Sequence, residues 1–142
     1  MIALKADRFF RRFEDVTPEI LKAEKVSLLL CDLDNTLRVR GEKEPSEELK
    51  AWALQCSEAG VKIVVVSNNI HKNKLKHFCK ILGVPCVGFA RKPFGSGLIK
   101  SIKKYGRPEE SAMLGDKRST DILAAKIAGI RAWQVKARRK IL

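Results

Sequence analysis

The chain has 142 residues, of which 45% are hydrophobic and 32% are charged, and its formal net charge at pH 7 is +13. This length suits one domain with a full hydrophobic core, so we expect a single domain over residues 1–142. No run of about twenty apolar residues occurs, which argues against a helix that crosses a bilayer. The four cysteines have no Cys-x-x-Cys spacing, which predicts reduced thiols instead of a disulfide framework or a zinc site.

Basic residues are concentrated in one half of the chain. Between residues 61 and 108 there is no Asp or Glu but there are eleven cationic residues, namely Lys62, Lys72, Lys74, Lys76, Lys80, Arg91, Lys92, Lys100, Lys103, Lys104 and Arg107. Such a surface attracts anionic partners such as nucleic acid, anionic lipid or phosphorylated metabolites. The alternative is a solvated basic face that aids solubility.

Residues 1–16 have the pattern of a short amphipathic helix. On a helical wheel one arc holds the apolar residues Ile2, Ala6, Phe9, Phe10 and Phe13, and the opposite arc holds Lys5, Arg8, Arg11 and Arg12. Aromatic residues facing cations are typical of a helix that lies on a membrane surface. A helix that packs against its own domain is the alternative.

Apolar runs and amphipathic segments alternate through the rest of the chain. Strands are expected over residues 26–31, 61–66, 86–89, 111–114 and 130–135, and helices over residues 17–25, 45–59, 72–82 and 96–105 and in a last segment that ends near residue 128. This alternation predicts an α/β, three-layer, Rossmann-like fold, with a five-stranded parallel sheet and helices on both faces. The core of the domain is expected over residues 26–135.

Two carboxylates follow the first buried strand. Asp32 and Asp34 are two residues apart and would repel each other, which indicates a cation beside them. The alternative is that Asp32, Asp34 and Asn35 only supply hydrogen bonds for a turn.

The other strands also end in polar residues: Ser67, Lys92, and Asp116 followed by Asp121. Parallel strands end at one edge of the sheet, so these groups are expected to meet at one site. A carboxylate cluster, a hydroxyl group and a cation together suit phosphoryl transfer, in which negative charge must be held and neutralised.

These motifs resemble those of the haloacid dehalogenase superfamily, subfamily IIIA. Within it the chain resembles the YqeG-like phosphatases, the group that contains phosphatidylglycerophosphate phosphatase. The matching segments are Thr17-Pro18-Glu19, Asp32 to Leu37, Val66-Ser67-Asn68-Asn69, Ala90-Arg91-Lys92-Pro93, and Gly115-Asp116 with Thr120-Asp121.

The resemblance implies a role for each motif residue. Asp32 would be the nucleophile that forms an aspartyl-phosphate, and Asp34 would be the general acid and base. Mg²⁺ would be bound by Asp32, by the backbone carbonyl of Asp34 and by Asp116, with support from Asp121. Ser67 would hydrogen-bond the phosphoryl oxygens and Lys92 would offset their charge. The expected substrate contacts are Asn68, Asn69, Arg91 and Lys117, together with Arg38 and Arg40 from the loop after the first strand.

No segment of the chain is long enough to form a cap domain over this site, and an open site suits a bulky substrate. We therefore expect Mg²⁺-dependent hydrolysis of phosphatidylglycerophosphate by a cytoplasmic protein that is peripherally bound to a membrane, or by a protein of an organellar matrix. The alternatives are a phosphatase for soluble sugar phosphates, a phosphatase for nucleic-acid ends, and a catalytically inactive anion-binding module. No nucleic-acid partner is expected, because no stripe of aromatic residues accompanies the site.

Overall fold

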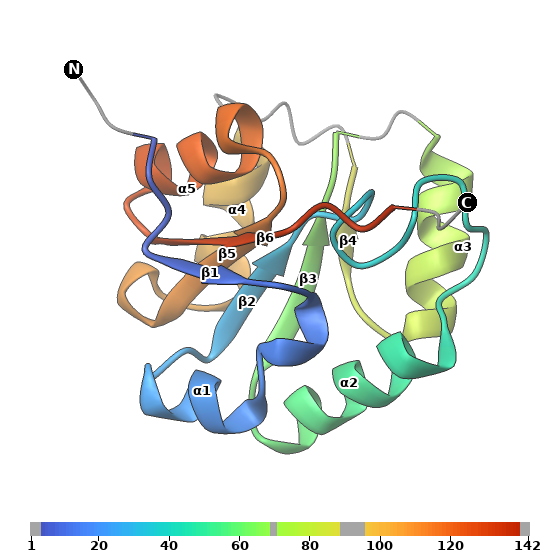
Figure 1. Cartoon of the computed structure of the whole chain (residues 1–142), viewed down its shortest axis with the longest axis horizontal. Coiled ribbons are helices and arrows are strands. Elements are labelled where there is room, and N and C mark those ends of the chain that lie inside the picture. Colours follow the sequence, from blue (N-terminus) through green and yellow to red (C-terminus); the bar gives the residue numbers. More distant parts are fainter. Residues whose placement is uncertain (1–3, 69–70, 89–95, 140–142) are drawn as a thin grey trace.

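A computed structural model describes residues 4–68, 71–88 and 96–139, which form a parallel sheet of six strands between two layers of helices (Figure 1). The strands are β1 (Arg8–Phe10), β2 (Leu28–Cys31), β3 (Lys62–Val66), β4 (Cys86–Val87), β5 (Ser111–Gly115) and β6 (Arg131–Val135). The α-helices are α1 (Pro18–Ala23), α2 (Glu47–Glu58), α3 (Lys72–Leu82), α4 (Ser96–Tyr105) and α5 (Leu123–Ala128). Short helical segments are η1 (Phe13–Asp15), η2 (Pro108–Glu110) and the π-helical η3 (Arg118–Ile122). The predicted fold is confirmed, with six strands where five were predicted.

The order of the strands in the sheet is β1-β6-β5-β2-β3-β4, and every pair is parallel. The chain runs outward from β2 to β3 and β4 on one side, and then crosses back to β5 and β6 on the other side. The order therefore reverses at β2. In open parallel sheets, ligands bind beyond the carboxyl ends of the strands at such a reversal.

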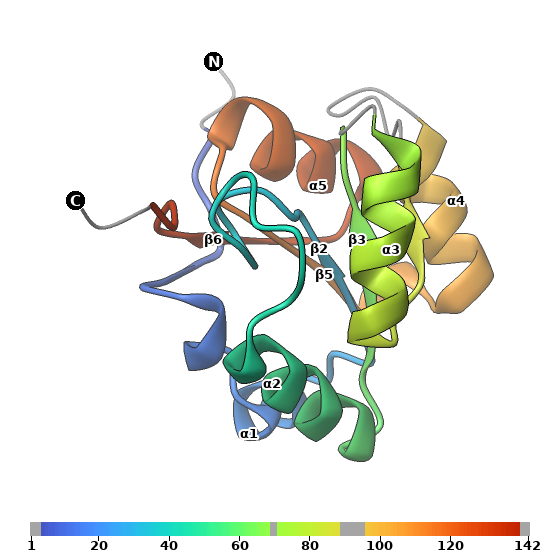
Figure 2. The same ribbon diagram turned by 90° about the vertical axis from the view of Figure 1, so that its right-hand side faces the viewer.

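The side chains of the sheet alternate between two hydrophobic clusters. Leu29, Cys31 and Val65 belong to a cluster with α1, α2 and α3, whereas Leu30 and Val64 belong to a cluster with α4 and α5. Figure 2 shows α4 and α5 across the sheet from α1 and α2. Since both faces are covered, the central strands are largely apolar, as the sequence predicts.

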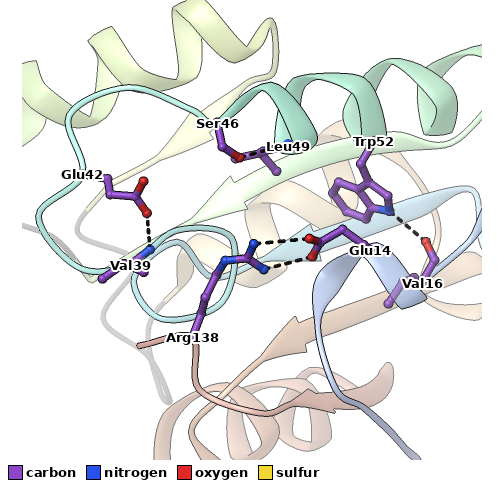
Figure 3. Close-up of polar contacts among 8 residues, drawn as sticks. All are labelled: Glu14, Val16, Val39, Glu42, Ser46, Leu49, Trp52 and Arg138. Carbon is purple, nitrogen blue, oxygen red and sulfur yellow. Dashed lines mark hydrogen bonds and ion pairs between the residues drawn. The ribbon is translucent and has the colours of Figure 1, made fainter. Parts of the chain in front are cut away.

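Two helices begin at hydroxyl caps. The Thr17 side chain accepts a hydrogen bond from the backbone N–H of Ile20 at 3.2 Å, and Ser46 accepts one from Leu49 at 3.1 Å (Figure 3). These oxygens satisfy N–H groups that have no partner inside the helix. The Ser46 cap also fixes where the loop after β2 ends and α2 begins.

The predicted amphipathic helix at the N-terminus is wrong for residues 4–16. Residues 8–10 form the edge strand β1, with Phe10 aligned to Val135 of β6, and a short 3-10 helix follows. Phe10 and Phe13 are buried and pack against Trp133 and Trp52, with ring centroids 5.5 and 5.1 Å apart. A membrane-surface helix would need both rings exposed, so pairing with β6 excludes that arrangement.

The prediction of reduced thiols agrees with the structure, in which none of the four cysteines forms a disulfide. Burial raises the pKa of the Cys56 thiol to about 12, so this side chain behaves as a small apolar group. No helix in the described part of the chain has the length and apolar composition needed to cross a membrane.

Candidate active site

Three carboxylates meet at the carboxyl edge of the sheet. Asp32, Asp116 and Asp121 each offer an oxygen, and these oxygens all lie within 4.8 Å of one another. Strand register explains the meeting, because Cys31 pairs with Leu114 and the Asp32 N–H donates to the Leu114 carbonyl at 3.0 Å. Residues far apart in the sequence therefore form one acidic cluster, as the strand ends predict.

Asp121 is the buried member of this cluster. It lies in η3, and one of its carboxylate oxygens accepts a hydrogen bond from the backbone N–H of Lys117 at 3.1 Å. Gly115 makes room for it, because a Cβ atom at that position would overlap the carboxylate of Asp121. Glycine is thus required here by a close approach of a side chain.

Asp116 is the member of the cluster that contacts the loop after β2, and it is half-buried. Its carboxylate accepts a hydrogen bond from the Thr36 hydroxyl at 3.3 Å. Burial, followed by the charge of Asp121, raises the pKa of the Asp116 carboxyl above its ordinary value. A carboxyl with a raised pKa that lies among other carboxylates is typical of a site that receives a cation or a proton.

The loop after β2 makes a tight turn that holds Asp34 in the wall of the pocket. Asn35 adopts a left-handed conformation with φ 65°, and its N–H donates to the Arg38 carbonyl at 2.7 Å. This turn brings the guanidinium of Arg38 to Asp34, with Nε 2.8 Å from Oδ1. Arg38 was predicted to contact substrate, and the structure places it at the site with its guanidinium bound to Asp34.

Ser67 and Asn68 follow β3 on the other side of Asp32. Ser67 is buried, and its backbone N–H donates to the Val87 carbonyl at 2.9 Å, which fixes the end of the strand. Asn68 is exposed. Both residues line the same pocket as Asp32, as predicted.

The pocket has a volume of about 1010 Å³, and charged and polar side chains form much of its wall. Predicted site residues in this wall are Asp32, Asp34, Arg38, Arg40, Ser67, Asn68 and Lys117. The wall also contains residues for which no role at the site was predicted, among them His71, Lys74, His77 and Thr120. Three of them belong to α3 or its cap, and the only signal that could have found them is the basic composition of that helix. Asn69, Arg91 and Lys92 lie outside the described residues.

No cap covers this pocket from the segment between β2 and α2. Residues 32–46 hold no helix and only the isolated bridge between Asp34 and Arg38. Arg40 and the residues that follow it, as far as Glu44, are exposed at the rim. The pocket is therefore bordered by a short loop.

The chain matches a family of known proteins. Residues 2–129 match the haloacid dehalogenase-like hydrolases. The chain belongs to this family. It is 32% identical over 124 residues to the probable phosphatase YqeG of Bacillus subtilis, covering 87% of this chain and 72% of that protein.

The fold resembles solved structures at lower identity. The cobalt-bound deoxy-D-mannose-octulosonate 8-phosphate phosphatase of Haemophilus influenzae superposes with a TM-score of 0.64 at 16% identity, covering 80% of this chain and 70% of that one. An uncharacterised protein of Listeria monocytogenes serotype 4b gives a TM-score of 0.61 at 17% identity, with 76% and 78% covered. The family match confirms the predicted haloacid dehalogenase-type enzyme, and the predicted phosphatase activity agrees with the name of the Bacillus subtilis relative.

Proposed function

We propose that this chain hydrolyses phosphate monoesters through a covalent intermediate on Asp32. The Asp32 carboxylate attacks phosphorus and the bond to the ester oxygen breaks, while Asp34 gives its proton to the departing oxygen. Asp34 then takes a proton from water, which attacks the aspartyl-phosphate and frees phosphate and Asp32. The observation that carries this proposal is the meeting of Asp32, Asp116 and Asp121 within 4.8 Å at the pocket that Asp34 lines.

The donor set suits a divalent cation. Three carboxylates whose oxygens lie this close repel one another unless a cation joins them, and oxygen ligands are those that Mg²⁺ prefers. We propose that Asp32, Asp116 and Asp121 hold Mg²⁺. The ion would neutralise charge on the phosphoryl group. Thr36 and the Lys117 N–H orient two of these carboxylates through their hydrogen bonds.

The remaining side chains of the pocket suit a phosphoryl group. Lys117 and Lys74 bring positive charge to its wall, and Ser67 brings a hydroxyl donor. Asn68 lies beside Ser67 and can contact the rest of a substrate. We expect the predicted roles of Asn69, Arg91 and Lys92 to complete this set.

The proposed substrate is phosphatidylglycerophosphate, and the proposed products are phosphatidylglycerol and phosphate. Three features support it: a short loop in place of a cap, a net charge of +13, and the similarity to YqeG. A lipid phosphate is bulky and lies at a membrane surface, so its enzyme must have an accessible site. The proposed location is therefore the surface of a membrane, on its cytoplasmic or organellar matrix side.

The test is phosphate release with Mg²⁺ from three substrates: detergent-dispersed phosphatidylglycerophosphate, a sugar phosphate and a 5′-phosphorylated oligonucleotide. We expect the lipid to give the highest kcat/KM. Asp32→Asn should abolish release, whereas Asp15→Asn in the exposed part of η1 should not change it. Substantial turnover by Asp32→Asn would remove Asp32 as nucleophile. A preference for the sugar phosphate or the oligonucleotide would keep the chemistry and overturn the lipid substrate.

A further inference from the structure

A second cavity lies on the other side of the loop after β2. Its volume is about 1130 Å³, and it is lined by residues from three separate segments, namely 9–12, 36–46 and 136–139. We call it the basic groove. It shares Arg38, Arg40, Gly41 and Glu42 with the pocket that holds Asp32, so one loop forms a wall of both cavities.

The basic groove collects cationic side chains, most of which have no ion pair among the described residues. Its cationic residues are Arg11, Arg12, Arg38, Arg40, Lys136, Arg138 and Arg139. Arg38 pairs with Asp34 and Arg138 pairs with Glu14, whereas the structure gives no ion pair for the other five in the described part of the chain. Glu42, the acidic residue of the lining, accepts a hydrogen bond from the Val39 N–H at 2.7 Å (Figure 3). Its carboxylate therefore stabilises the loop.

The segments of the groove are tied together. Arg138 donates two hydrogen bonds to the Glu14 carboxylate, at 2.9 and 3.2 Å (Figure 3). The Arg138 N–H donates to the Asn35 carbonyl at 2.6 Å, and the Lys136 N–H donates to the Phe10 carbonyl at 3.1 Å. A bidentate pair of this kind fixes direction as well as distance. The tail is thus held beside β1 and the loop, with Lys136 and Arg139 exposed at the groove.

An aromatic side chain stands among these cations. Phe9 lines the groove and is 60% exposed, whereas Phe10 beside it points into the core. Successive side chains of a strand point to opposite faces, so Phe9 points outward where Phe10 points into the core. Aromatic rings among cations favour the boundary between the acyl chains and the headgroups of a membrane.

We propose that the basic groove binds the phosphate groups of anionic lipids and docks the enzyme on a bilayer. This inference rests on the proposed lipid substrate. Phe9 enters the boundary, while Arg11, Arg12 and Arg139 contact headgroups. Because Arg40 and the rest of the shared loop also border the catalytic pocket, docking by the groove places Asp32 and Asp34 beside the membrane surface. A lipid phosphate then reaches the nucleophile while its acyl chains stay in the bilayer.

The size of the effect follows from surface electrostatics. Each Arg or Lys near an anionic membrane strengthens binding by about fivefold at moderate salt. Loss of two such residues is therefore expected to weaken binding by more than about tenfold, and added salt should weaken the wild-type protein in the same direction. Arg11 and Arg12 are suitable for replacement because both are exposed and neither side chain has a hydrogen bond or ion pair among those of the described residues.

The experiment measures co-sedimentation with phosphatidylcholine vesicles that contain or lack phosphatidylglycerol. Arg11→Gln/Arg12→Gln should weaken binding to the anionic vesicles by more than about tenfold and leave hydrolysis of a small chromogenic phosphate unchanged. Lys100→Gln/Lys103→Gln in α4 is the matched control, because it removes the same charge from two exposed positions that do not line the groove. This control should lose less than half of its binding. Equal melting temperatures exclude misfolding as the cause.

Two outcomes overturn the docking groove. One is equal loss of vesicle binding in both double variants, which would mean that net charge alone attracts the protein. The other is unchanged vesicle binding in Arg11→Gln/Arg12→Gln together with weaker binding of a 5′-phosphorylated oligonucleotide, which would assign the groove to nucleic acid. Failure of the proposed function is distinguishable, since wild type would then dock through the groove and release no phosphate from phosphatidylglycerophosphate.

Discussion

Asp34 and Arg38 form an ion pair in which Nε lies 2.8 Å from Oδ1 and both side chains are largely buried, with 17% and 10% exposed. Arg38 is held by two further contacts, a hydrogen bond from Nη1 to the Glu42 carbonyl at 2.6 Å and a position over the Phe78 ring, 5.1 Å from its centroid. These two contacts hold the guanidinium in place independently of its ion pair with Asp34. We therefore expect Arg38 to act as a positioning residue that orients Asp34, the proposed acid and base.

Arg38→Met should impair both stability and catalysis. The change leaves a largely buried carboxylate without its cation, which costs about 3 kcal/mol in the free energy of unfolding. Since Asp34 then loses its fixed orientation, kcat should fall by more than about tenfold while KM changes less. Urea unfolding and steady-state kinetics on a chromogenic phosphate measure the two effects.

Lys50→Met is the control for that variant. Lys50 also pairs with an acidic residue at 2.8 Å, but its partner Glu47 has an 86% exposed side chain. Exposed pairs contribute about 0.5 kcal/mol, so this variant should be close to wild type. An unchanged kcat in Arg38→Met would remove the positioning role, and double-mutant analysis with Asp34→Asn would then show no coupling.

The acidic cluster could be predicted from the sequence because each strand carries its own signal, an apolar run followed by an Asp. Asp32 and Asp116 each follow an apolar run, and parallel strands must end at one edge of the sheet. The pairing of Asp34 with Arg38 could not be predicted in this way. It depends on the left-handed turn at Asn35, which a pattern of apolar and polar residues does not encode.

Gly115→Ala should disrupt the cluster while leaving its three carboxylates in the sequence. The new methyl group would overlap the side chain of Asp121, which is fully buried and has no free direction in which to move. Overpacking of this kind costs about 1–3 kcal/mol, and displacement of Asp121 should also weaken Mg²⁺ binding by more than about tenfold. Calorimetric titration with Mg²⁺ and thermal unfolding test the two consequences.

Gly106→Ala is the matched control for that substitution. A methyl group there would meet Cβ and Cδ2 of the buried Leu28 at 3.1 Å, at the end of β2 opposite to Asp32. It should cost some stability and leave Mg²⁺ affinity unchanged. If Gly115→Ala bound Mg²⁺ as tightly as wild type, Asp121 would not be a ligand or a support of the ion.

The N-terminal segment was mispredicted because five apolar residues fit a helical period and their partner lies far along the chain. β1 has three residues, and it pairs with β6 more than 120 residues later. A periodicity argument cannot detect such pairing, and short segments fit more than one period. The same long-range pairing explains why five strands were predicted where six are present.

Phe13→Ala and Phe9→Ala distinguish the observed packing of this segment from an amphipathic helix on a membrane surface. Phe13 is fully buried against Trp52 and beneath Arg138, so its truncation should cost about 3–5 kcal/mol in the free energy of unfolding. Phe9 is exposed, and its truncation should change stability by less than about 0.5 kcal/mol. Urea unfolding measures both values. Equal small effects would mean that residues 8–16 do not pack as described.

The raised pKa of Asp116 predicts how pH and Mg²⁺ act on stability. The metal-free folded chain holds this proton more tightly than the unfolded chain, whose carboxyl titrates near 3.8. The stabilisation of the folded chain by this proton is therefore fully present below that value and is lost as the pH rises through the raised pKa of Asp116. A cation favours the ionised carboxylate, so stabilisation by Mg²⁺ should grow with pH through the same window. Melting temperatures with and without Mg²⁺, from about pH 4 to about pH 7, measure this growth. Asp116→Asn should flatten it, and an equally steep dependence in that variant would place the coupled proton on another group.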